Sequence, residues 1–316
     1  MRTCLPNRVA VFFQPLTRYA YLRSDMFSKR FCKPEPQEEE EDDYHTATQA
    51  EEDEAKRLWG SMRDWFFEKG YTLFELGKLG HSKPSLDTPS DIGTSPEHPF
   101  AFFGGDPPHY EPLKAYYSTK VCFAQDAKRR HVAIKKLNKP DEIRIYRFLF
   151  EKRELLAENS ILPILEILDY QEHCFAVMPR WGEDTCYPDT GTIGNVLNYI
   201  HCLLKAINFL HSNSIVHRDL KSDNTLVNHF GAHRRNDENV MRPVLRSAGQ
   251  LTYALFDFDL SLMLPSNECR LPASRSFEVL SVPWPYDNFQ GELDYDPYKF
   301  EMGCLGIFLC QMFQVE

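Results

Sequence analysis

The sequence has no pair of cysteines at the close spacing that a zinc ribbon requires. Its nine cysteines are scattered, and their odd number does not fit a disulfide framework. Thiols that stay reduced are typical of intracellular proteins. We therefore expect an intracellular protein, in the cytoplasm or the nucleus.

Long hydrophobic runs and an excess of basic charge are missing too. The longest apolar run, 304–313, has about half the length of a membrane span, so we expect no membrane partner. The chain has 36 Lys and Arg against 46 Asp and Glu, a net charge of −10. General nucleic-acid binding favours a basic surface, so we expect no nucleic-acid partner either.

What is present suffices for a packed core. The 316 residues are 42 % hydrophobic and 13 % aromatic, which allows one large or two modest domains. Residues 1–54 differ from the rest, because a basic start is followed by acidic runs that repel each other and stay solvated. We predict a disordered extension there. The basic start is also typical of a mitochondrial targeting segment.

The segment 55–112 is predicted to form one helix and a linker. Apolar residues from Ala55 to Phe66 recur at helical spacing, and Gly70 ends the pattern. The stretch 81–99 is rich in proline and serine, as linkers are.

Strand and helix patterns follow one another in the second half of the chain. A short β-type run ends at Lys135, and Pro140 suits the first turn of a helix. The runs 161–170 and 174–178 predict two neighbouring strands. From Ile193 to Leu210 the apolar residues keep helical spacing, which predicts the strongest helix.

Four motifs stand in a fixed order along this half: Val132–Lys135, Glu142, His217–Asn224 (HRDLKSDN) and Asp257–Asp259. Together they resemble the strand lysine, helix glutamate, catalytic loop and metal-binding motif of eukaryotic protein kinases. The resemblance begins near Leu113. It implies an α+β fold of two lobes, a β-rich small lobe at 113–178 and a partial, mainly helical large lobe at 179–316.

The resemblance implies a role for each charged residue in phosphoryl transfer. Asp219 would accept the proton of the attacking hydroxyl, and Lys221 would neutralise the transferred phosphate. A lysine at this place is similar to serine/threonine kinases. Lys135 would hold the α- and β-phosphates of ATP, and Glu142 would pair with Lys135.

ATP and Mg²⁺ are the implied cofactors. Asn224 and Asp257 would supply the oxygen ligands of Mg²⁺. At the adenine end, Met178 resembles the gatekeeper residue, and 179–181, which includes Trp181, resembles the hinge whose backbone binds adenine.

The sequence departs from the family pattern near the phosphates. No glycine lies between Leu113 and His131, where the family has its phosphate-covering loop, and Gly104 and Gly105 are too far upstream to replace it. Asp259 stands where the family has glycine. Only seven positions separate Lys135 from Glu142, which requires a helix directly after the strand.

Two further departures concern the large lobe. The stretch 296–306 resembles the start of its central helix, with Glu301 in place of the expected aspartate, and the sequence stops ten residues later. We expect apolar surface around Leu305, Phe308 and Phe313, and a partner that covers it. The extra residues at 229–250 predict a basic surface loop. Alternatively, they form a docking loop for an acidic partner, and the chain's own acidic run at 35–54 is one candidate for that partner.

Three functions fit these observations. The first is an active serine/threonine-type protein kinase with an unknown protein substrate. The second is a kinase-like interaction module without catalysis, or a truncated product, in which loss of Asp219 would change nothing. The third is a small-molecule kinase of related fold, such as an aminoglycoside phosphotransferase. The pattern most resembles divergent kinase-like proteins of mushroom-forming fungi.

Overall fold

A computed structural model describes residues 49–76, 81–86, 96–106, 115–116, 118–183, 185, 192–231, 239–265, 270–272 and 294–313. They belong to one unit of the chain, residues 47–316. The predicted targeting segment, and residues 1–48 of the predicted disordered extension, lie outside the described residues. For residues 49–54 the prediction of disorder was wrong, because they form the first turns of a helix that begins at Gln49. Among the described residues, no helix is long and apolar enough to cross a membrane.

Five antiparallel strands form the central sheet in the order β1-β6-β7-β9-β8. They are β1 (Thr72–Leu73), β6 (Val121–Gln125), β7 (His131–Leu137), β8 (Glu166–Tyr170) and β9 (His173–Pro179). With helices α2 to α5 this sheet makes up the small lobe. The small lobe therefore begins earlier than the predicted residue 113, since its edge strand β1 lies within the stretch assigned to a helix and a linker.

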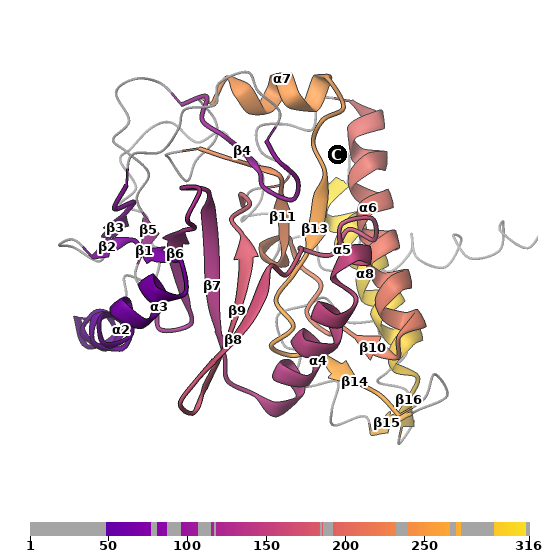
Figure 1. Ribbon diagram of the computed structural model, residues 1–316. Coiled ribbons are helices and arrows are strands. Elements are labelled where there is room, and N and C mark those ends of the chain that lie inside the picture. Colours follow the sequence, from indigo (N-terminus) through magenta and orange to yellow (C-terminus); the bar gives the residue numbers. More distant parts are fainter. Residues whose placement is uncertain are drawn as a thin grey trace, which may run out of the picture. The chain divides into compact units, whose positions relative to one another are not determined.

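Helices α2 (Gln49–Ser61) and α3 (Arg63–Glu68) cover one face of the sheet (Figure 1). The prediction of one helix was wrong, because the chain bends at Met62 between the two. Successive side chains of β9 point to opposite faces of the sheet, and both faces are buried. Phe175 points to α2 and α3, where its ring packs 5.2 Å from Phe66, and Met178 points to the opposite core.

The two neighbouring phenylalanines of α3 offer a matched test of this covering layer. Phe66 is fully buried, whereas Phe67 is 67 % exposed. We expect Phe66→Ala to lower the free energy of unfolding by about 3–5 kcal/mol, because it leaves a cavity under the sheet. Phe67→Ala should change it by less than about 0.5 kcal/mol. Chemical denaturation of both variants measures the difference, and equal effects would contradict this packing.

On the other face, α4 (Pro140–Glu151) and α5 (Arg153–Leu156) follow β7 directly. Pro140 occupies the first turn of α4, as its fixed φ angle favours and as the sequence predicts. Ile145, Tyr146 and Leu149 of α4 are fully buried and join the main core.

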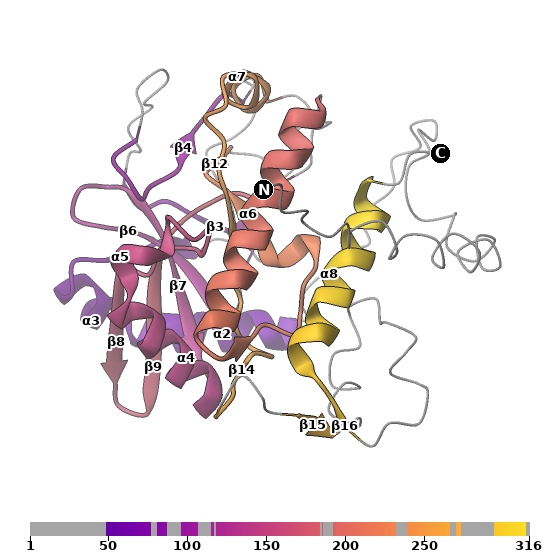
Figure 2. The same ribbon diagram turned by 90° about the vertical axis from the view of Figure 1, so that its right-hand side faces the viewer.

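The large lobe is built on α6 (Ile193–Ser212) and α8 (Pro297–Phe313), which lie side by side (Figure 2). The side-chain oxygen of Thr192 accepts a hydrogen bond from the amide of Asn195 and caps α6. The prediction of apolar surface around Leu305, Phe308 and Phe313 is wrong. Leu305 and Phe308 are buried, and the ring centroid of Phe313 lies 5.9 Å from that of Tyr199 on α6.

Short strand pairs surround these helices: β10 (Ile215–Val216) with β14 (Leu262–Met263), β11 (Thr225–Val227) with β13 (Tyr253–Leu255), and β15 (Leu271–Pro272) with β16 (Asp294–Tyr295). The three-stranded sheet of β2 (Glu75–Leu76), β3 (His81–Lys83) and β5 (Ala115–Tyr116) belongs to the connection between β1 and β6.

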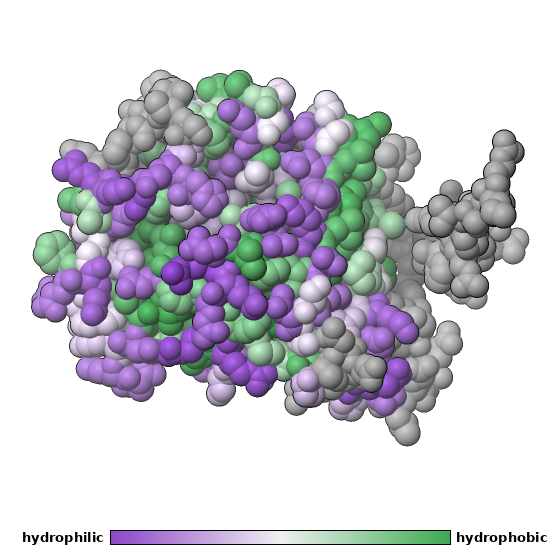
Figure 3. Space-filling view, turned by 45° about the vertical axis from the view of Figure 1, so that its right-hand side comes forward, coloured by the Kyte–Doolittle hydropathy of each residue, from purple (hydrophilic) through white to green (hydrophobic). Residues whose placement is uncertain are grey.

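Exposed apolar side chains gather on α6, whereas α8 exposes Met302. The side chains of Ile193, Leu197 and Leu204 are exposed on α6. Figure 3 shows an apolar stripe at the upper right of the molecule. A partner that covers apolar surface of the large lobe remains a prediction.

A segment at residues 96–106, the lobe-crossing segment, joins the two lobes a second time. Its strand β4 (Phe102–Phe103) pairs in parallel with β12 (His229–Phe230) of the large lobe. The amide of Gly104 donates to the carbonyl of Phe230 at 3.2 Å. At Gly105 the φ angle is +88°, and a Cβ there would lie 2.4 Å from Cβ of Met241, so glycine is required.

The other end of the lobe-crossing segment contacts the small lobe. Glu97 pairs with Arg130 at 2.8 Å, next to the turn between β6 and β7. The indole nitrogen of Trp181 donates to the carbonyl of Pro99 at 3.0 Å. The segment therefore runs beside residues 179–183, which are the first connection between the lobes.

The extra residues between β11 and β13 form β12 and α7 (Met241–Ser247). Arg242 and Arg246 do not belong to a basic surface, because Arg242 is fully buried and Arg246 is 5 % exposed. A docking role for the rest of the insertion stays a prediction. Arg242 donates to the carbonyls of Glu183 at 3.0 Å and His229 at 2.9 Å. Positions 232–238 of this insertion lie outside the described residues.

Candidate active site

The candidate site centres on Lys135, in the middle of β7. Its side chain is only 8 % exposed. The ammonium nitrogen lies 2.6 Å from Oε1 of Glu142, in the first turn of α4, and 2.5 Å from Oδ1 of Asp257, in the loop after β13. The fold thus brings three of the predicted site residues into direct contact.

The short spacing between Lys135 and Glu142 is accommodated by the turn before α4. Only Asn138 and Lys139 separate β7 from the helix. The amide of Asn138 donates to Oε2 of Glu142 at 3.1 Å, so the glutamate holds the turn as well as the lysine.

The neighbouring side chains determine the charges of Lys135 and Asp257. Burial alone would lower the pKa of Lys135, but Tyr146, Asp257 and Glu142 together raise it above its usual value. Burial also opposes ionisation of Asp257, yet the Lys135 ammonium holds the pKa of that carboxyl below its usual value. At neutral pH the site therefore contains the Lys135 ammonium beside the charged carboxylate of Asp257.

The catalytic-loop residues form a second cluster. The side-chain nitrogen Nδ2 of Asn224 donates to both the carbonyl oxygen and Oδ2 of Asp219, at 2.8 Å each. Lys221 places its ammonium 3.0 Å from the same Oδ2. The 3₁₀ turn Ser222–Asn224 brings Asn224 back to Asp219. Two predicted site residues, Lys221 and Asn224, therefore contact the Asp219 carboxylate.

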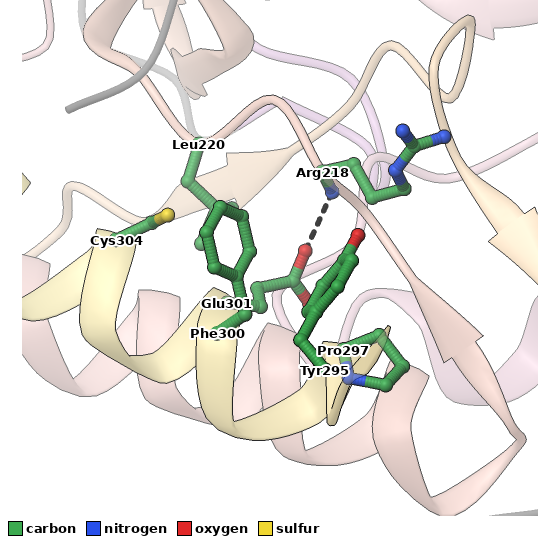
Figure 4. Close-up of a pocket in the computed structure, with 7 residues that line it drawn as sticks. All are labelled: Arg218, Leu220, Tyr295, Pro297, Phe300, Glu301 and Cys304. Carbon is green, nitrogen blue, oxygen red and sulfur yellow. Dashed lines mark hydrogen bonds between the residues drawn. The ribbon is translucent and has the colours of Figure 1, made fainter. Parts of the chain in front are cut away.

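Glu301 of α8 anchors the catalytic loop from below (Figure 4). Its Oε1 accepts a hydrogen bond from the amide of Arg218 at 2.6 Å, and Oε2 lies 2.7 Å from Nε2 of His211 on α6. Arg218 has a φ angle of +69°, which side chains rarely adopt. The sequence identified Glu301 as a replacement for aspartate, but its contact with His211 was missed because 90 residues separate the two.

Phe258 joins the two lobes behind these clusters. It is 2 % exposed and packs edge-on against Tyr146 of α4 and His217 of the catalytic loop. The ring nitrogen Nε2 of His217 lies 2.8 Å from the carbonyl oxygen of Phe256. These contacts keep α4 close to the catalytic loop.

Asp259, the residue in place of glycine, is paired with small-lobe lysines. Its Oδ1 lies 2.7 Å from Nζ of Lys139, and its Oδ2 lies 3.5 Å from Nζ of Lys120. Burial acts to raise the pKa of Asp259, but hydrogen bonding and charge from Lys139, with the charge of Lys120, keep it below its usual value. These contacts could not be predicted from the sequence, since a lysine before a strand or helix is common.

Residues at the adenine end form an aromatic wall. Met178 is buried at the end of β9, and Trp181 follows in the connection between the lobes. Between them, the Arg180 guanidinium stacks 3.8 Å from the ring centroid of Phe123 and 5.2 Å from that of Phe230. Sequence reasoning did not find this cluster, because its rings come from three distant segments.

The residues present fit a magnesium ion and nucleotide phosphates. The amide of Phe256 donates to the carbonyl of Asn224 at 3.1 Å, which holds the neighbouring Asp257 beside the catalytic loop. An amide oxygen and a carboxylate from two adjacent loops are hard ligands of the kind that Mg²⁺ takes together with phosphate. Lys135 places positive charge next to them.

A glycine hairpin does not link β1 to β6. The connection runs from residue 74 to residue 120 and contains the lobe-crossing segment. Gly104 and Gly105 contact the large-lobe insertion rather than the site: the carbonyl of Gly104 accepts from the side chain of Asn239 at 2.9 Å.

Comparison with known proteins supports the resemblance. Two relatives are named serine/threonine-protein kinase US3 homolog. The protein of Varicella-zoster virus (strain Dumas) is 32 % identical over 80 residues, and that of Cercopithecine herpesvirus 9 (strain DHV) is 33 % identical over 75 residues. These matches cover 24 % and 22 % of this chain, and 20 % and 22 % of the relatives. The matched part thus spans about a fifth of the length of these relatives.

A family description, the protein kinase domain, matches residues 117–276, just over half of the chain. The match begins where the long connection after β1 ends and includes both residue clusters described above. The strand order, the Lys135–Glu142 pair and the catalytic loop agree with it. The chain therefore belongs to the protein kinase family.

Proposed function

We propose that this protein is a serine/threonine-type protein kinase that transfers the γ-phosphoryl group of ATP to hydroxyl groups of a protein. One observation carries the proposal: Lys135 contacts Glu142 and Asp257 directly, while Asp219, Lys221 and Asn224 form the adjoining cluster. The charged groups that phosphoryl transfer needs are therefore present and close to one another.

In this mechanism Asp219 orients the attacking hydroxyl and takes up its proton. A hydrogen bond from the side chain of Asn224 holds the Asp219 carboxylate in place. Lys221, already 3.0 Å from that carboxylate, stabilises negative charge on the transferred group. The new bond joins the hydroxyl oxygen to phosphorus, the bond to the bridging oxygen breaks, and ADP leaves.

Lys135 binds the α- and β-phosphates, and Glu142 keeps its side chain in that position. Asn224 and Asp257 would hold Mg²⁺, which neutralises phosphate charge when bound. Because Lys135 and Asp257 contact each other here, nucleotide binding requires this pair to share its charges with the phosphates and the metal.

A specific observation also favours a second function, a kinase-like interaction module that lacks catalysis. The connection between β1 and β6 leads through the lobe-crossing segment and β4, where active kinases carry a glycine loop over the phosphates. Backbone amides of such a loop cradle a triphosphate. Weak ATP binding would support this second function.

The names of the relatives and Lys221 support serine and threonine as acceptors. The protein substrate is unknown, and we propose neither a nucleic acid nor a membrane as a partner. The scattered cysteines support a place in the cytoplasm or nucleus. The resemblance to fungal kinase-like proteins stays a prediction.

Thermal unfolding with and without Mg·ATP tests nucleotide binding. Ligand at about 100 times its Kd stabilises a protein by about 2.7 kcal/mol, which raises Tm by about 4–5 °C at this size. We expect such a shift, and we expect Asp257→Ala to abolish it. No shift in the wild-type protein would contradict ATP binding and favour the interaction module.

Transfer to serine, threonine and tyrosine peptide pools tests catalysis. Asp219→Asn should lower kcat by about 10²–10⁴-fold, because the proton acceptor is lost while the fold is kept. Asp223→Asn, four residues away and exposed, is the matched control and should keep the wild-type rate. Equal rates for Asp219→Asn and the wild-type protein would contradict the proposed mechanism.

A further inference from the structure

Asp259 has contacts that a glycine at its position could not make. Its carboxylate reaches two parts of the small lobe at once: Lys139, the residue before α4, and Lys120, the residue before β6. The Lys139 ammonium also lies 3.1 Å from the carbonyl oxygen of Asp259. One large-lobe residue thus holds the starts of a helix and a strand in the other lobe.

The start of α4 is the part of the helix that matters for the site. Glu142, the partner of Lys135, lies three residues after Lys139 in the first turn. A shift of this turn away from the large lobe would carry the Glu142 carboxylate away from the lysine. Fixing Lys139 therefore fixes the position of Glu142.

A second contact acts in the same direction. The guanidinium of Arg144, one turn further along α4, donates to the carbonyl of Met263 at 2.5 Å. Phe258 packs against Tyr146 on the inner side of the helix. The segment 258–263 therefore touches α4 along its first two turns, and Asp259 makes the ionic contact at the end nearest Glu142.

The alternative role, a further ligand of Mg²⁺, fits the contacts less well. Both carboxylate oxygens of Asp259 already face ammonium groups, at 2.7 Å and 3.5 Å. A metal ion at these oxygens would have to displace or lie against two positive charges.

We propose that Asp259 is a positioning residue that ties the start of α4 and the start of β6 to the large lobe and so holds Glu142 against Lys135. The catalytic part of this proposal rests on the proposed kinase function; the structural part does not. The pairs are partly exposed, so their effect is moderate rather than all-or-none.

Charge exchange between Asp259 and Lys139 tests the contact. We expect Asp259→Asn and Lys139→Gln each to lower kcat on the order of five-fold. The double variant Asp259→Lys with Lys139→Glu should restore a large part of the rate, because opposite charges face each other again. Lys152→Gln, at the far end of the same helix, is the matched control and should behave as the wild-type protein.

Hydrogen exchange gives a readout that does not need activity. Backbone amides at 143–147 of α4 should lose protection in both single variants and regain it in the charge exchange. If the wild-type protein transfers no phosphate but this pattern appears, the proposed function fails and the positioning role stands. Unchanged exchange in both single variants would overturn the positioning role.

The magnesium dependence separates the metal alternative. If Asp259 were a metal ligand, Asp259→Asn would raise the Mg²⁺ concentration needed for half-maximal rate, and Lys139→Gln would leave rate and exchange unchanged. That result would overturn the proposal. An unchanged Mg²⁺ requirement, together with lower kcat in both variants, would support it.

Discussion

Replacement of Lys135 by methionine is expected to destabilise the protein by about 3–5 kcal/mol and to abolish phosphoryl transfer. The ammonium is the counter-ion of Glu142, whose side chain is 1 % exposed, and of the less buried Asp257. Removing one member of a buried ion pair leaves the other charge without compensation, which is costly. Urea denaturation and a peptide transfer assay measure the two effects.

Controls for this prediction are available on the same strand. Lys136→Met changes the neighbouring, half-buried lysine and should alter stability by less than about 0.5 kcal/mol. In the double variant Lys135→Met with Glu142→Leu, both members of the buried pair become apolar, so most of the lost stability should return while transfer stays absent. A Lys135→Met protein as stable as the wild type would show that the pair is not buried as described.

The second large effect is expected at Arg242. Its guanidinium donates to the carbonyls of Glu183 and His229 and, at 3.1 Å, to Nδ1 of His229. Because His229 is buried and its carbonyl oxygen and Nδ1 lose this donor, Arg242→Met should cost about 3 kcal/mol and lower Tm by about 5 °C. Scanning calorimetry is the direct measurement.

Two further variants show whether hydrogen bonding or mere helix packing causes this loss. Arg242→Lys should remain destabilised, since one ammonium cannot replace the planar fork that reaches several acceptors. Val244→Ala, on the same helix but 65 % exposed, should leave Tm unchanged within about 1–2 °C. A wild-type Tm for Arg242→Met would mean that α7 contributes nothing to the stability of residues 179–183.

Motifs with strong local constraints could be predicted from the sequence. The strand that ends near Lys135, the helix that begins at Pro140 and the long helix from Ile193 are all present. Each has a regular apolar period or a residue with a fixed backbone preference, so its structure depends little on distant partners.

What the sequence did not predict depends on distant contacts. Strand β1 has two residues and no detectable period, and it exists because it pairs with Ala124 and Gln125 of β6. In the sequence, Arg242 cannot be distinguished from a basic surface residue. Its burial depends on contacts with Glu183 and with His229 of β12, which lie elsewhere in the chain. Arginines are usually expected at the surface, but hydrogen-bond acceptors supplied by other segments allow this one to be buried.

The lobe-crossing segment has a consequence for the order of folding during synthesis. Residues 102–103 pair with residues 229–230, more than a hundred positions later in the chain. A ribosome releases the β6 to β9 part of the sheet well before it releases β12, so that part can pair while the lobe-crossing segment still lacks its strand partner. Closing such a distant contact is slow compared with local pairing. The small lobe therefore reaches its final structure only after part of the large lobe has left the ribosome.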